Sequence, residues 1–113
     1  MERKFLLLII SILLGCDSKS DCNELETLNR EQECIAIVTE LPVYANIFLS
    51  NGIDPNTNKK CACIEADRWW RNYIDEIEIG DTIIKKKGEL SFNIHKKGRV
   101  ITHYWECKGK VYK

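Results

Sequence analysis

Residues 90–107 read LSFNIHKKGRVITHYWEC, and this stretch alternates apolar and polar side chains with a period of two. Leu90, Phe92 and Ile94 share one face, a pattern typical of a half-buried β-strand. The Lys96–Gly98 segment fits a three-residue hairpin loop with glycine in the left-handed conformation. The residues after this loop alternate in the same way. The sequence therefore predicts an antiparallel β-hairpin here.

The rest of residues 34–113 also has a composition typical of β-strands. Residues 35–49 are rich in β-branched and aromatic side chains, and residues 59–65 indicate a further short strand. Asp67 is a suitable N-cap for one short helix over residues 68–74. We therefore expect residues 34–113 to form an all-β domain, a small barrel or roll of about five to six mostly antiparallel strands with one short helix.

The N-terminus has the features of a bacterial export signal. A short basic head, MERK, precedes an apolar run over residues 5–14 that is too short to span a bilayer as a helix. Gly15-Cys16 closes this run and resembles the lipobox of bacterial lipoproteins, although Leu14 is bulkier than the usual residue there. We expect residues 1–15 to be a lipoprotein signal peptide and Cys16 to carry the lipid that anchors the chain to a membrane, outside the cytoplasm. The alternative is an ordinary exported protein that is cleaved elsewhere.

The segment after the signal is polar and acidic. Residues 16–33 contain few aliphatic side chains, of which Leu25 and Leu28 lie one helical turn apart. We expect this segment to form a flexible polar tether, with at most one turn of helix, that reaches roughly 20–25 Å as a coil. Charge is uneven in the mature chain, with a net −8 over residues 16–84 and a net +7 over residues 85–113. Either the two parts lie against each other, which we favour, or the basic part faces an anionic partner.

Five cysteines follow the acylation site, and outside the cytoplasm such thiols oxidise. In an extended strand the sulfurs of Cys61 and Cys63 point to the same face about 6.7 Å apart along the chain, which does not suit a disulfide between them. Cys34 begins the β-rich domain, and Cys107 ends its last long strand. We therefore expect two disulfides that join Cys34 and Cys107 to Cys61 and Cys63, in either order, with Cys22 left over in the tether.

Three stretches together resemble a known group of proteins. They are residues 53–63 (IDPNTNKKCAC), residues 79–90 (IGDTIIKKKGEL) and residues 105–113 (WECKGKVYK). The set is similar to small, functionally uncharacterised, lipid-anchored lipoproteins of Bacteroidota-type bacteria, and it covers most of residues 34–113. The resemblance implies a similar fold and the same lipid-anchored placement, and it implies no activity.

The tryptophan pair Trp69-Trp70, flanked by Arg68 and Arg71, is the best candidate for a partner contact. Adjacent helical residues diverge by about 100°, so one indole can enter the core while the other stays near the surface. An exposed tryptophan beside an arginine suits stacking on a sugar ring or on a protein partner. The alternative is that both indoles are buried and cap one end of the fold.

Basic side chains gather in the last three predicted strands. They are Lys85, Lys86, Lys87, Lys96, Lys97, Arg99, Lys108, Lys110 and Lys113. Because hairpin ends project together, one hypothesis is that several of them, Lys96, Lys97 and Arg99 included, form one cationic rim that would favour lipid headgroups, an acidic glycan or an acidic protein. The alternative is neutralisation by acidic residues between positions 75 and 81. The sequence contains no nucleic-acid-binding motif, and we expect no nucleic-acid partner.

One pattern resembles a calcium loop. Asp54, Asn56 and Asn58 with Glu65 reproduce much of an EF-hand motif, but Lys59 occupies the position that needs glycine for the sharp turn. We therefore expect a plain Asx turn between two strands, with no bound metal and no cofactor.

The leading functional hypothesis is a non-enzymatic binding or interaction module of the cell envelope, with a protein or an anionic glycan as partner. The alternative is a thiol or metal-handling envelope protein that uses Cys61, Cys63 and a histidine, His95 or His103. The second cysteine pair of a typical zinc site is missing, and no serine nucleophile elbow is present. A count of free thiols separates the two hypotheses, because a thiol or metal role requires at least two.

Overall fold

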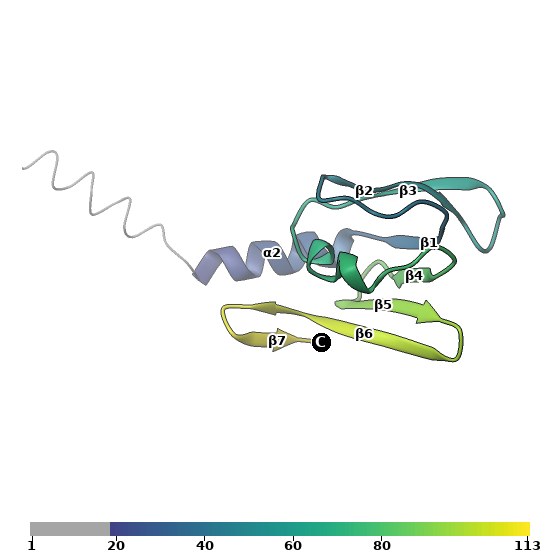
Figure 1. Ribbon diagram of the computed structural model, residues 1–113. Helices are drawn as coiled ribbons and strands as arrows, with labels where there is room; N and C mark the ends of the chain where they lie inside the picture. The colour runs from purple at the N-terminus through teal and green to yellow at the C-terminus, as the bar shows by residue number, and fades with distance from the viewer. Residues whose placement is uncertain (1–18) are drawn as a thin grey trace, which may run out of the picture.

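The computed structural model describes residues 19–113, so the predicted signal peptide (residues 1–15) and the predicted lipid on Cys16 lie outside the described residues. In chain order the elements are α2 (Lys19–Glu31), β1 (Cys34–Val38), β2 (Ile47–Ile53), β3 (Lys60–Ile64), the 3₁₀ helix η1 (Trp70–Glu76), β4 (Thr82–Lys85), β5 (Ser91–Lys96), β6 (Arg99–Cys107) and β7 (Lys110–Tyr112). The strands form one antiparallel sheet of order β3-β2-β1-β4-β5-β6-β7 (Figure 1). Among these residues, no helix has the length and apolar character needed to cross a bilayer.

The sheet confirms the predicted all-β class and corrects its details. It has seven strands rather than five to six, and it is open rather than closed into a barrel. The additional strand arises at Lys108 and Gly109, which both have positive φ (51° and 79°), as a tight two-residue hairpin turn requires. The chain therefore reverses where we expected the last strand to end, and β7 pairs with the last three residues of β6.

The hairpin predicted from residues 90–107 is present as β5 and β6. Leu90, Phe92 and Ile94 are all buried, as their spacing predicts. The loop is one residue shorter than expected, because Lys96 pairs directly with Arg99 across the two strands. Gly98 has the expected positive φ, 82°.

The core lies between the sheet and η1. Trp70 is fully buried, and its indole stacks on Phe92 with the ring centroids 5.7 Å apart and meets Phe48 edge-on at 5.6 Å. Tyr73 also stacks on Phe92, at 5.9 Å. Aromatic pairs of this kind contribute about 0.5–1.5 kcal/mol each beyond the burial of their area. The aromatic cluster therefore fixes the position of η1 on the sheet.

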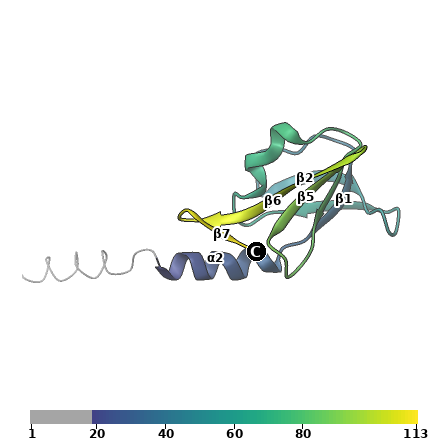
Figure 2. The ribbon, with the colours of Figure 1, turned by 90° about the horizontal axis from the view of Figure 1, so that it is seen from below.

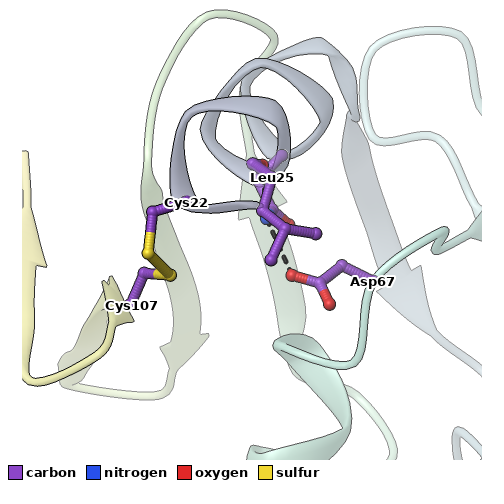
Figure 3. The surroundings of a disulfide bond; sticks show 5 residues. Cys22, Leu25, Asp67 and Cys107 are labelled. Atoms are coloured by element: carbon purple, nitrogen blue, oxygen red, sulfur yellow. Dashed lines mark hydrogen bonds between the residues drawn. A yellow bond between two sulfur atoms is a disulfide. The ribbon is translucent and has the colours of Figure 1, made fainter. Parts of the chain in front are cut away.

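The expected flexible tether over residues 16–33 is wrong for the part that the structure describes, because residues 19–31 form the helix α2. Its N-terminal turn is attached to the end of β6 by the Cys22–Cys107 disulfide. Further along the helix, Asn29 Nδ2 donates to Asp67 Oδ2 at 2.8 Å. Figure 3 shows the disulfide on one side of the helix and Leu25 pointing toward Asp67 on the other.

The C-terminal end of α2 is held by a buried lysine. Lys85 is fully buried in β4, and its ammonium donates to the carbonyl oxygens of Arg30 (3.2 Å), Gln32 (2.6 Å) and Lys86 (3.0 Å). The last carbonyls of a helix lack partners within the helix and carry partial negative charge, so a cation is favourable there. Burial lowers the pKa of Lys85 to about 8. The backbone N–H of Gly88 adds a bond to the Arg30 carbonyl at 2.6 Å.

The disulfides match the prediction in one case and not in the other. Cys34 pairs with Cys63, as one of the expected orders has it. Cys107 pairs with Cys22 rather than with Cys61, so the expectation that Cys22 is left over is wrong. Cys61 is the unpaired cysteine among residues 19–113. Two disulfides indicate an oxidising compartment outside the cytoplasm.

Removal of the Cys22–Cys107 disulfide should destabilise the domain. This bridge closes a loop of 85 residues in sequence separation, so its loss in Cys22→Ser/Cys107→Ser should lower the free energy of unfolding by about 2–4 kcal/mol in urea titrations. Cys61→Ser is the matched control and should unfold like the parent chain, because it removes a thiol that bridges nothing. Equal stability of the double variant and the parent would contradict this role of the bridge.

Candidate functional site

A hollow of about 400 Å³ opens between α2, the segment that leads into η1, and the end of β6. Its apolar and aromatic walls come from Leu25 of α2, Trp69, Tyr73 of η1 and Trp105 of β6. Its polar rim is formed by Asp67, Arg68, Asn72, Glu106 and Lys108, and the disulfide-bonded Cys107 lies beside it. Aromatic walls and charged rim groups thus converge at this hollow, as they do at many ligand sites.

The aromatic walls are held rigidly by their neighbours. Trp105 contacts Tyr112 with the ring centroids 4.7 Å apart. Tyr73 stacks on His103 at 3.7 Å with the rings nearly parallel, and His103 Nε2 lies 2.8 Å from Glu76 Oε1. A ligand in the hollow would therefore meet a preformed surface rather than mobile side chains.

The tryptophan pair does not form an exposed contact. Trp70 is entirely inside the core, and Trp69 is only 5% exposed although it lines the hollow. Both indoles are thus buried, which is the alternative that the sequence left open. Of the two flanking arginines, Arg68 is exposed on the rim, whereas Arg71 donates to Asn46 Oδ1 at 3.0 Å and has its Nε 3.5 Å from Glu65 Oε1.

A buried carboxyl group positions the start of η1. Glu65 is fully buried, and its Oε2 accepts the backbone N–H of Trp70 at 2.5 Å. Burial raises the pKa of Glu65 to about 7, while the bond from Trp70 and the nearby charge of Arg71 act in the opposite direction. Asp67, the predicted N-cap, instead accepts from Arg68 N and from Asn29, and the helix covers residues 70–76 rather than 68–74.

The sequence did not identify Glu65 as the residue that holds this helix. It lies five positions before Trp70, too far for an ordinary N-cap, which bonds to an amide two or three residues later. The contact exists because β3 ends beside η1 in the folded chain. No local pattern carries that information.

The calcium-like stretch is an Asx turn, as predicted. Asp54 Oδ1 accepts the backbone N–H groups of Asn56 (2.7 Å) and Thr57 (3.3 Å), and Asn58 has a positive φ of 62°. Glu65, the fourth member of the pattern, is bonded to η1 instead.

The structure does not assemble the thiol or metal site of the alternative hypothesis. Cys63 is in a disulfide, and Cys61 Sγ lies 3.9 Å from the Ile35 carbonyl oxygen. Burial raises the pKa of Cys61, and Asp54 raises it further. Within residues 19–113, no group of three or more His, Cys, Asp or Glu side chains is arranged to hold a metal ion.

The basic residues of the last strands lie at two ends of the sheet rather than along one rim. Lys97 and Arg99 are exposed at the β5–β6 turn, whereas Lys108 is at the β6–β7 turn, and β6 separates these turns (Figure 1). Lys96 is paired with Asp81 at 2.5 Å and with Glu78 at 3.0 Å, and these carboxylates raise its pKa. Lys96 is thus neutralised in place.

Glu65 should make the stability of the domain depend on pH. Since its pKa is raised from 4.5 to about 7, the folded state keeps the proton in a range where the unfolded chain has released it. The free energy of unfolding should therefore fall as pH rises from about 4.5 to about 7, by about 1–3 kcal/mol. Glu65→Gln keeps the acceptor for Trp70 and removes the titration, so urea unfolding across this window should show the fall only in the parent chain. Glu24→Gln, at an exposed position, should behave like the parent; the same slope in Glu65→Gln would rule the explanation out.

Comparison with known proteins finds no relative of this chain. No protein family, no curated protein and no solved structure matches this chain. The resemblance to lipid-anchored lipoproteins therefore stays a prediction, and the function is inferred from the residues of the chain itself.

Proposed function

We propose that this chain is a lipid-anchored protein of the bacterial cell envelope that binds a partner and catalyses no reaction. The observation that carries the proposal is the N-terminal order of basic head, apolar run, Gly15 and Cys16. The two disulfides support it, because they fit an exported protein in an oxidising compartment.

The hollow beside α2 is the proposed binding surface. Its aromatic walls offer apolar area, and Arg68 and Lys108 on its rim offer cations to a carboxylate, phosphate or sulfate of the partner. That chemistry is found on acidic glycans and on acidic protein segments. Three side chains of types that often act in catalysis make structural contacts here. Cys63 is in a disulfide, His103 stacks on Tyr73, and Glu65 accepts a hydrogen bond from the start of η1.

The anchor is tested at Cys16. Cys16→Ser should abolish acylation, so the exported domain should move from the membrane fraction to the soluble fraction. Mass spectrometry of the N-terminus and fractionation of envelopes measure the two effects. Cys61→Ser is the control and should remain lipidated. If the Cys16→Ser chain loses its signal peptide and still pellets with the membranes, the proposed anchor is wrong.

The binding surface is tested by charge reversal. Arg68→Glu should reduce capture of an anionic partner from intact envelopes, and it should weaken binding of acidic glycan fragments in solution. The matched control is Arg99→Glu, an exposed arginine at the β5–β6 turn, which should bind like the parent chain. Binding to the parent should weaken with added salt, because the Debye length is only about 8 Å at physiological ionic strength. Equal loss in both variants would mean that overall charge, and not the hollow, attracts the partner.

A further inference from the structure

Helix α2 and the β6–β7 turn project from the same end of the domain, and the β5–β6 turn and the β2–β3 loop project from the opposite end (Figures 1 and 2). We infer that the domain stands end-on at the bilayer, with the β6–β7 turn and the N-terminal turn of α2 against the lipid headgroups and the β5–β6 turn facing away. This inference rests on the lipid anchor proposed at Cys16.

The first step is the short connection to the anchor. Only three residue steps separate Cys16 from Lys19, where α2 begins, and a fully extended chain spans no more than about 11 Å over that distance. The start of α2 is therefore held close to the lipid whatever conformation the connection adopts. The 20–25 Å coil that the sequence suggested is not available, because most of its residues are in the helix.

The second step is that α2 is fixed to the sheet at both ends. Cys22 in its N-terminal turn is covalently bonded to Cys107, and Arg30 in its last turn accepts hydrogen bonds from Lys85 and Gly88. The Arg30 side chain returns a bond from Nη1 to the Gly88 carbonyl oxygen at 3.0 Å. The helix thus cannot swing relative to the sheet, and the anchor point determines which end of the domain faces the membrane.

The third step is the length of β6. Cys107 ends this strand beside the start of α2, and Arg99 begins it at the other turn, eight residue steps or roughly 27 Å away. The β5–β6 turn therefore lies well beyond the reach of the connection to Cys16. In this orientation the Leu25 and Lys108 side of the hollow is nearest the headgroups, and Arg68 lies on the side formed by the segment that leads into η1.

The chemistry of this end suits a headgroup layer. Lys108 and Lys110 are exposed cations, and Asp21, Glu24 and Glu106 are exposed anions in the same region. Every phospholipid headgroup carries a phosphate, and many also carry an ammonium group. The lysines can therefore pair with the phosphates, and the carboxylates can pair with the ammonium groups. The mixed charge predicts contact with zwitterionic as well as anionic lipid, in contrast to a purely basic surface.

The test uses the lipidated full chain in vesicles of zwitterionic phospholipid that carry a nitroxide quencher on some headgroups. A fluorescent amino acid is introduced at Lys110, next to the β6–β7 turn, or at Lys97, in the β5–β6 turn; both side chains are exposed, so neither label disturbs the core. We expect a loss of fluorescence at position 110 and none at position 97. Equal quenching at the two positions, or stronger quenching at 97, would overturn the end-on orientation.

The design separates the orientation from the anchor on which it rests. Mass spectrometry of the N-terminus and flotation of the vesicles report whether the chain is acylated and bound, independently of the fluorophore. If the exported chain carries no lipid at Cys16, the proposed anchor is refuted and the orientation with it. A lipidated chain that floats and is quenched equally at both positions would refute the orientation alone.

Discussion

The ammonium group of Lys85 lies inside the domain and donates to three main-chain carbonyl oxygens, two of which belong to the C-terminal end of α2 and the residues that follow it. An unpaired charge in such a place would be strongly unfavourable, so the lysine and the helix end require each other. Together with the Cys22–Cys107 disulfide at the other end, this contact joins α2 to the sheet. The hollow has its α2 wall only because the helix is held there.

A second buried ionisable group, the carboxyl of Glu65, plays a corresponding role for η1, the other element that covers the sheet. Glu65 accepts a hydrogen bond from the backbone N–H of Trp70 and lies beside the guanidinium of Arg71. Arg71 in turn donates to the side chain of Asn46, in the segment before β2. The aromatic cluster around Phe92 can pack tightly against η1 because this carboxyl group sets where the helix begins. In a chain of this size, where the core is small, such specific polar contacts supplement burial of apolar surface.

The parts of the fold that follow from local patterns could be predicted from the sequence. The alternation of Leu90, Phe92 and Ile94 identifies the β5–β6 hairpin, and the residues after Asp54 identify an Asx turn, because in both cases neighbours in sequence determine the structure. Helix α2 lacks such a signal. Its attachment depends on contacts with residues more than fifty positions away, namely Lys85 and Cys107, and its apolar face is narrow.

The candidate site could be predicted only in part for the same reason. Arg68 was named as a contact candidate and is exposed beside the hollow, but the sequence alone did not decide between burial of both indoles and exposure of one. Trp105 and Lys108 join the site through the β6–β7 turn, which depends on the positive φ of Lys108. That conformation is uncommon for a lysine and gives no clear pattern in the sequence.

The unpaired Cys61 bears on how the correct disulfide pairing is maintained. Cys61 is two residues from Cys63, which is bonded to Cys34. A free thiol so close in the chain can attack this disulfide and rearrange it. The attacking species in thiol–disulfide exchange is the thiolate, so a thiol whose pKa is raised by burial and by Asp54 reacts slowly at neutral pH. The environment of Cys61 therefore lowers the fraction of thiolate that is available to attack the Cys34–Cys63 bridge.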